Sequence, residues 1–98
     1  MNVNIGTWFV YMLRCSDGSL YTGVTTDIER RFLEHKEGKT GAKYTRSRFP
    51  ISVVYRETCA SRSEAQIRES AIKKYTKNEK ELLIKQSKKE NLINKSTS

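Results

Sequence analysis

Histidine and cysteine are scarce in this chain, and their scarcity excludes several kinds of site. The 98 residues include one histidine and two cysteines. Cys15 and Cys59 are too far apart to match a zinc-ligand spacing, and a single possible pair makes no disulfide framework. We therefore expect two reduced, buried thiols and no structural zinc site. With His35 as the lone histidine, no Ser-His-Asp arrangement is evident either.

Long apolar runs are also missing. No stretch approaches the ~20 apolar residues that a membrane span needs. Residues 1–7 have neither the basic nor the apolar region of a signal peptide. No glycine-rich phosphate loop is present. We therefore expect a cytoplasmic protein that has no membrane partner.

Positive charge is what the chain has in excess. Lys and Arg number 19 against 11 Asp and Glu, which gives a net charge of +8. A domain this basic is expected to meet a polyanion, which can be DNA, RNA or an anionic membrane. The alternative is a merely soluble basic surface, because an abundance of Lys and Arg is a weak signal until it is localised.

Three strands are predicted from side-chain patterns. Residues 8–15 are rich in aromatic and branched side chains, which predicts a buried strand, and residues 20–25 form its return strand. The Asp17-Gly18 dipeptide between them tolerates the positive φ of a tight hairpin. Alternation from Ile51 to Glu57 predicts a third strand, with Ile51, Val53 and Tyr55 on one face.

Three helices are predicted from their capping signals. The first ends at Gly38, and the second runs to about Thr76. The predicted N-caps with their acidic partners are Thr26 with Glu29, Ser61 with Glu64, and Asn78 with Glu81.

The order ββαβαα predicts an α+β fold in which a three-stranded antiparallel sheet is flanked by helices. The length suits one domain with one modest core. We expect this domain to cover residues 1–87 and to be followed by a polar, disordered tail over residues 88–98.

Five polar residues are predicted to lie near the core on one surface. They are Tyr11, Tyr21, Arg31, His35 and Glu69. Glu69 lies on the same helix as the inward-facing Ala65 and Ile72, so its carboxylate needs a partner or a metal. Phenols, a cation and a carboxylate suit attack on a phosphodiester, which needs a base, charge stabilisation and usually a divalent metal.

The same residues resemble the signature of the GIY-YIG nuclease superfamily. Phe9-Val10-Tyr11 and Tyr21-Thr22-Gly23 look like its two tripeptides, and Arg31 with His35 is similar to its Arg-x-x-x-His helix. Glu69 falls in the helix where the family keeps its metal-binding Glu. The resemblance covers about residues 8 to 85 and is closest to the small, stand-alone bacterial branch.

The chain departs from the family pattern at several positions. Phe9 stands in place of the first Gly, and Thr22 in place of the Ile of the second tripeptide. Asn78 or Asn91 could match a late Asn that family members use near the phosphate. Larger relatives carry a separate DNA-recognition domain, which is not seen in this chain.

The resemblance implies a role for each residue. Tyr11 would be the general base or the ligand of the attacking water, and Tyr21 would orient the same water. Arg31 would grip the scissile phosphate, and His35 would bond the phosphate or shuttle a proton. Glu69 would hold a single Mg²⁺ or Mn²⁺ ion, weakly when DNA is not bound.

Each role has a structural alternative. Tyr11 and Tyr21 are then core tyrosines with satisfied hydroxyls, and His35 is favoured by the dipole at a helix C-terminus. Gly23 would let the strand approach the helix or the DNA backbone, or would simply end the strand. The alternative ion-pair partners are Asp27 or Glu34 for Arg31, and Arg62, Arg68 or Lys73 for Glu69.

The loop from Gly38 to Pro50 is basic and has no acidic residue. We expect it to contact phosphates and to stack on a base through its tyrosine; the alternative is a solvated loop. The residues concerned are Lys39, Lys43, Tyr44, Arg46 and Arg48.

The function that these features predict is metal-dependent hydrolysis of DNA phosphodiester bonds. The resemblance extends this to a structure-selective endonuclease for repair or processing of branched, nicked or single-stranded DNA. Two alternatives stay open. One is a nucleic-acid-binding module without turnover, and the other is an interaction adapter for a larger repair complex.

Overall fold

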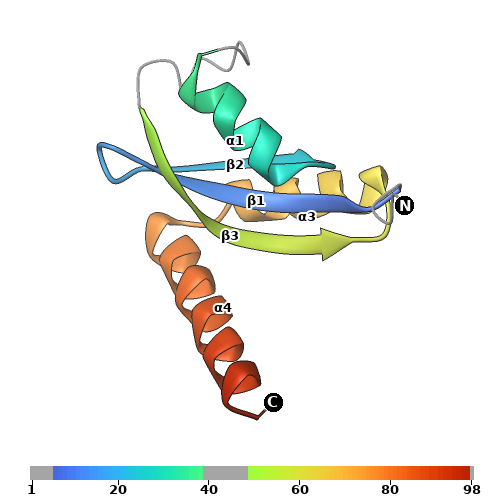
Figure 1. Ribbon diagram of the computed structural model, residues 1–98, viewed down its shortest axis with the longest axis vertical. Helices are drawn as coiled ribbons and strands as arrows, with labels where there is room; N and C mark the ends of the chain where they lie inside the picture. The colour runs from blue at the N-terminus through green and yellow to red at the C-terminus, as the bar shows by residue number, and fades with distance from the viewer. Residues whose placement is uncertain (1–5, 39–48, 98) are drawn as a thin grey trace.

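The computed structural model describes residues 6–38 and 49–97, and its element order confirms the predicted ββαβαα arrangement. Among these residues, no helix is both long and apolar enough to cross a bilayer. The basic loop residues named above lie outside the described residues. The elements are β1 (Trp8–Cys15), β2 (Leu20–Thr25), α1 (Ile28–Lys36), β3 (Pro50–Cys59), α3 (Arg62–Lys73) and α4 (Lys77–Thr97) (Figure 1).

The strands form an antiparallel sheet in the order β2-β1-β3, so β1 is central and β2 and β3 are edge strands. The register of the β1–β2 hairpin pairs Tyr11 with Gly23 and Leu13 with Tyr21. Gly18 has φ +84° in the connecting turn, as the Asp-Gly signal predicted. This register places the first tyrosine of the signature directly opposite the last glycine.

Side chains of β1 alternate between two apolar layers. Tyr11 and Leu13 pack with Ile28 of α1 on one face. Val10 and Met12 face the other way, where the layer includes the following residues of the two later helices: Ala65, Ile72 and Ile84. The sheet therefore separates α1 from α3 and α4.

The prediction that Ile51, Val53 and Tyr55 share one face is wrong. Val53 packs in the α1 layer, Tyr55 is buried in the opposite layer, and Ile51 is 56% exposed. The cause lies in the β1–β3 register, which shifts between Met12 and Leu13 and again between Arg14 and Cys15. Each shift inserts an extra residue into β3 and reverses the alternation of its side chains.

Two predicted helix caps are also wrong, each by one or two positions. Asp27, not Thr26, caps α1, because its carboxylate accepts a hydrogen bond from the backbone N–H of Arg30 at 3.1 Å. Thr76, not Asn78, caps α4 and exchanges hydrogen bonds with Glu79. The cap of α3 is confirmed, since the Ser61 side chain accepts from Glu64 N.

The disordered tail over residues 88–98 stays a prediction. The backbone is helical through Thr97 as part of α4. No glycine or proline follows Pro50, and the residues of this segment include good helix formers such as Lys88, Lys89 and Leu92. The domain limit at residue 87 stays a prediction.

Candidate active site

The site begins with Tyr11, which β1 places on the α1 face of the sheet. The side chain is 1% exposed, and its ring lies over Gly23 of the neighbouring strand. A Cβ added to Gly23 would lie 2.6 Å from the Tyr11 hydroxyl oxygen and 2.8 Å from Cζ. Glycine is therefore required here by the tyrosine itself, whereas the sequence suggested the approach of a helix or of DNA.

His35 lies at the end of the Tyr11 side chain. Its Nε2 is 3.1 Å from the Tyr11 hydroxyl oxygen, and the residue is 1% exposed. Burial, with the nearby charge of Arg31, lowers the pKa of His35 below its ordinary value, while Glu34 opposes this. The imidazole is then neutral at neutral pH. With Tyr11 as donor, Nε2 accepts and Nδ1 carries the ring proton.

Tyr21 completes an aromatic group on this face. Its ring meets the ring of His35 edge to face, with centroids 4.9 Å apart. The Tyr11 and Tyr21 centroids are 6.3 Å apart. The structure thus brings the two signature tyrosines and the histidine together, as the sequence predicted for one shared surface.

Burial raises the pKa of Tyr11 well above that of an ordinary phenol, and nearby Tyr21 and Glu69 raise it further. The charge of Arg31 and a hydrogen bond from it act in the opposite direction. Tyr11 is therefore a neutral phenol in the resting site. It can act as a base only when a proton acceptor or additional positive charge is at hand.

Arg31 and its neighbour Arg30 differ clearly in their surroundings. The Arg31 side chain is 37% exposed and hydrogen bonds to Glu34 at 3.1 Å, and its pKa also responds to a hydrogen bond with Tyr11. The Arg30 side chain is 59% exposed and pairs with Asp27 and Glu34. Arg31 is thus the arginine of the Tyr11 site. The alternative of a pair with Glu34 is also present.

Glu69 stands on α3, which packs on the opposite side of the sheet from Tyr11. Its side chain is 20% exposed, and its carboxylate lies 3.2 Å from Lys73 Nζ, so this predicted ion-pair alternative is present too. Helix α3 packs against β1 and the edge strand β2. Of the causes that shift the pKa of Tyr11, the charge of Glu69 is the smallest, and it acts to raise that pKa.

Thr22 and the two late asparagines can also be placed. Thr22 is 3% exposed, and its hydroxyl has no hydrogen-bond partner among the residues that the structure describes. Thr22 therefore fills an apolar position much as Ile would. Asn78 is exposed in the first turn of α4, and Asn91 lies beyond the described side chains.

The donors fit a weakly held hard cation. Within residues 6–38 and 49–88, no three His, Cys, Asp or Glu side chains gather as a metal cage. Mg²⁺ and Mn²⁺ prefer oxygen ligands, and Mg²⁺ is commonly bound by one or two carboxylates together with water and substrate phosphate. Glu69 would be the carboxylate of such a site.

A family model described as the GIY-YIG catalytic domain matches residues 7–94. The chain belongs to the GIY-YIG family. Membership confirms the resemblance seen in the two tripeptides and indicates a nuclease domain. In general, GIY-YIG nucleases act on DNA and use divalent metal ions.

This GIY-YIG chain is similar in sequence to relatives of similar size. The UPF0213 protein DP2720 of Desulfotalea psychrophila is 56% identical over 82 residues, which cover 84% of this chain and 74% of the relative. The UPF0213 protein SERP0126 of Staphylococcus epidermidis is 49% identical over 78 residues, covering 80% of this chain and 94% of the relative.

Two solution NMR structures share the fold. The UPF0213 protein BH0048 of Bacillus halodurans is 44% identical with a TM-score of 0.52, and the match covers 81% of this chain and 83% of that one. The protein EF2693 of E. faecalis is 46% identical with a TM-score of 0.56, and the match covers 82% and 84% respectively.

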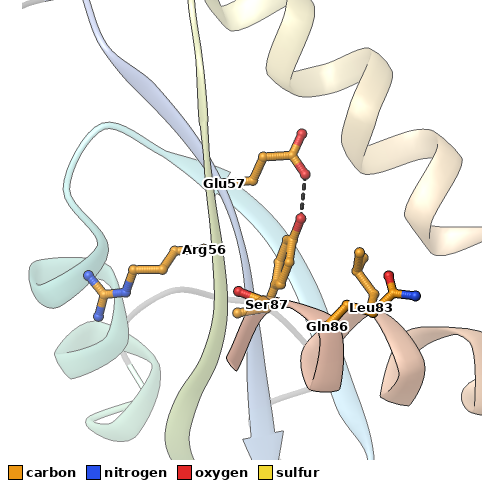
Figure 2. A pocket seen from close by; sticks show the side chains of 6 residues that line it. Arg56, Glu57, Leu83, Gln86 and Ser87 are labelled. Carbon is orange, nitrogen blue, oxygen red and sulfur yellow. Dashed lines mark hydrogen bonds between the residues drawn. The ribbon is translucent and has the colours of Figure 1, made fainter. Parts of the chain in front are cut away.

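A pocket of about 250 Å³ that the sequence did not predict lies between β3 and α4. Figure 2 shows Tyr55 donating a hydrogen bond to Glu57 beside it, while Arg56 points away toward α1, where it bonds Glu29. Arg68 donates to both carboxylate oxygens of Glu57 at 3.0 Å. Burial and the Glu57 carboxylate raise the pKa of Tyr55 to about 12.

This network belongs to the layer opposite Tyr11 and His35. Arg68, the cation of this network, is already paired with the Glu57 carboxylate, which also accepts from Tyr55. Arg68 is therefore not free to bind a phosphate. No sequence signal marked it, because Glu57 and Arg68 stand on different elements. The predicted site residues Tyr11 and His35 therefore lie on the α1 side of the sheet, and this pocket lies on the other side.

Proposed function

We propose that this chain is a metal-dependent DNA endonuclease that hydrolyses phosphodiester bonds. The observation that carries the proposal is the hydrogen bond of 3.1 Å between the Tyr11 hydroxyl and His35 Nε2, beside Arg31. A neutral imidazole is a proton acceptor, and it sits where the phenol would have to lose its proton. Packing of the Tyr11 ring over Gly23 fixes the position of the phenol oxygen for this transfer.

The residues act together in one hydrolysis step. Tyr11 gives its proton to His35 Nε2 and takes a proton from water, whose oxygen attacks phosphorus as the bond to the leaving oxygen breaks. Arg31 binds non-bridging oxygens and stabilises the charge that develops on them. Tyr21 helps to orient the water.

Glu69 is the residue that would hold Mg²⁺ or Mn²⁺. A bound ion would supply positive charge close to Tyr11, which offsets the effect of Glu69 and favours ionisation of the phenol. One carboxylate makes a weak site, so affinity for the ion is expected to rise when DNA phosphates are present.

Branched, nicked or single-stranded DNA is the proposed substrate, in repair or processing, in the cytoplasm and with a larger repair complex as a further partner. The net charge of +8 supports contact with phosphates, which gives affinity without reading base sequence. Selection would then come from the shape of the DNA.

The test is nicking of supercoiled plasmid with and without Mg²⁺ or Mn²⁺. We expect metal-dependent nicking by the natural chain and none by Tyr11→Phe, which keeps the ring over Gly23 but removes the proton. Branched and nicked oligonucleotides would be cut faster than intact duplex. DNA binding without cleavage of any of these substrates would contradict the proposal.

The second hypothesis is a GIY-YIG-fold module that binds nucleic acid without turnover. The ion pair between Glu69 and Lys73 favours it, since a carboxylate that keeps its lysine partner is not available to a metal. Under this hypothesis DNA affinity would be the same with Mg²⁺ and with EDTA.

A further inference from the structure

Four charged residues form a continuous chain along α1. Asp27 lies 3.8 Å from Arg30, Arg30 lies 3.4 Å from Glu34, and Glu34 lies 3.1 Å from Arg31. The two arginines bind different oxygens of the Glu34 carboxylate: Oε2 meets Arg30, and Oε1 meets Arg31. The carboxylate is thus held from one side while it holds Arg31 on the other.

The pairing with Arg31 uses only part of the guanidinium. Glu34 accepts from Nη1, and the planar fork has further donors on its other nitrogens. Arg31 lies one turn before His35 on α1, and His35 Nε2 is 3.1 Å from the Tyr11 hydroxyl, so Arg31 is on the face of the helix that meets Tyr11. The Glu34 and Arg31 side chains are 29% and 37% exposed.

We propose that Glu34 is a positioning residue that fixes the guanidinium of Arg31 beside the Tyr11 hydroxyl, with Arg30 holding the second oxygen of the carboxylate. This inference rests on the proposed function. An arginine side chain has many rotamers, and a mobile one would meet the phosphate in the required orientation only part of the time. Glu34 removes that freedom before DNA binds.

The Glu34 carboxylate helps catalysis by orienting Arg31, but it weakens DNA binding. A negative charge next to the phosphate site repels DNA, so Glu34 weakens the complex while it orients Arg31. The proposal therefore predicts a split between the two kinetic constants. Loss of Glu34 lowers kcat, and KM falls or stays unchanged.

The first experiment compares nicking rates of Glu34→Ala and Glu34→Gln. Displacing a catalytic group by about 1 Å can lower a rate ~10²-fold, so we expect kcat of Glu34→Ala to fall about 10- to 100-fold. Glu34→Gln keeps an acceptor oxygen for Arg31 and should recover most of the rate. An unchanged kcat in Glu34→Ala would overturn the proposal.

Glu29→Ala is the matched control. Glu29 is on the same helix and carries the same charge, but its side chain is 72% exposed and pairs with Arg56 at 2.9 Å. We expect its kcat to equal that of the natural chain. If Glu29→Ala loses as much kcat as Glu34→Ala, the effect is one of net charge or helix stability, and the proposal is wrong.

A double variant tests whether Glu34 acts through Arg31. If it does, Arg31→Ala with Glu34→Ala is no slower than Arg31→Ala alone, because the group to be positioned is already missing. Rate losses that multiply would mean that Glu34 acts by another route, such as its effect on His35, and would reject the positioning role.

An NMR measurement on the DNA-free protein separates this proposal from the proposed function. The Arg31 guanidinium should give sharp, slowly exchanging Nη–H signals that disappear in Glu34→Ala and return in Glu34→Gln. Equal signals in all three proteins would overturn the positioning role even if the enzyme cuts DNA. Failure of the natural chain to cut any DNA would contradict the endonuclease while the signals still test the contact.

Discussion

At the scale of single residues, the hydroxyl of Tyr11 is held by two contacts of different kinds. His35 receives its hydrogen bond, and Gly23 leaves the space in which its ring lies. The hairpin signal was enough to predict that Tyr11 and Tyr21 lie on neighbouring strands, and the register puts both on one face. The need for glycine at position 23 could not be predicted in this way, because it depends on where a ring from the next strand comes to rest.

We expect Gly23→Ala to be both less stable and inactive. The new Cβ would meet the Tyr11 side chain within 2.8 Å, so the ring must move. Overpacking of this kind costs about 1–3 kcal/mol. Thermal unfolding measures the loss, and plasmid nicking measures the activity. Tyr11→Phe removes the closest contact, so the double variant should regain part of the stability lost in Gly23→Ala; a loss that simply adds would contradict the packing account.

His35 makes stability depend on pH in a predictable direction. Its pKa is lowered in the folded protein, mainly by burial and by Arg31, from about 6.5 in the unfolded chain. Between these two pKa values the unfolded chain binds more protons, so stability is lost as pH falls below about 6.5. Among the described residues, the groups that act on the ring include Tyr11, Tyr21, Arg31 and Glu34.

Melting temperatures of the natural chain and of His35→Gln between pH 5 and pH 8 test this prediction. The natural chain should lose more stability on acidification than the variant, which has no imidazole to protonate. Its nicking should also decline at acid pH, because an imidazolium cannot accept the Tyr11 proton. Parallel melting curves for the two proteins would contradict the assignment.

At the scale of elements, the hairpin and the cap of α3 were predictable because their signals are local. The pairing of β3 was not, since its two register shifts depend on the fit between β1 and β3. Thr26 and Asp27 are both good capping residues, and only the backbone conformation selects Asp27. The packing of α3 against β2 and β1 sets where Glu69 lies relative to Tyr11, and no spacing in the sequence encodes that packing.

The position of Glu69 on α3 leads to a prediction about metal dependence. Glu69→Gln keeps the shape of the side chain and removes its charge, so the fold should persist. Metal-dependent nicking should disappear, while DNA binding in EDTA should persist or tighten because repulsion of the phosphate is relieved.

Lys73→Ala is the control for this change. It removes the ion pair with Glu69 but leaves the carboxylate in place, and its side chain is 53% exposed. We expect it to keep metal-dependent nicking and to lose well under ~1 kcal/mol of stability. A fully active Glu69→Gln protein would remove the metal-site assignment.

At the scale of the whole molecule, the sheet divides two kinds of polar group. The Tyr11, Tyr21 and His35 cluster lies with α1, whereas Glu57 lines the pocket between β3 and α4 (Figure 2) and pairs with Arg68 of α3. Composition predicted a basic protein but not which face binds DNA. The proposal that the α1 face binds DNA rests on the pairing of the strands, which places Tyr11 and Tyr21 there.

The net charge of +8 predicts DNA binding that is sensitive to salt and insensitive to sequence. Replacing Lys43, Arg46 and Arg48 together by Ala should weaken binding to all sequences and reduce the log–log salt slope by about one unit for each lost contact. Fluorescence anisotropy across a salt series measures both effects. An unchanged slope would show that the loop from Gly38 to Pro50 does not contact phosphates.

The packing of Tyr11 over Gly23 also has a consequence for sequence divergence. A side chain at position 23 is compatible with the sheet only after the ring at position 11 has become smaller or has moved, so the two positions are not free to change independently. A lineage that loses the tyrosine is released from the glycine, but the reverse order of substitutions passes through a destabilised protein. The glycine is therefore expected to be the later of the two to change, and a relative with a larger residue at position 23 should already lack the phenol.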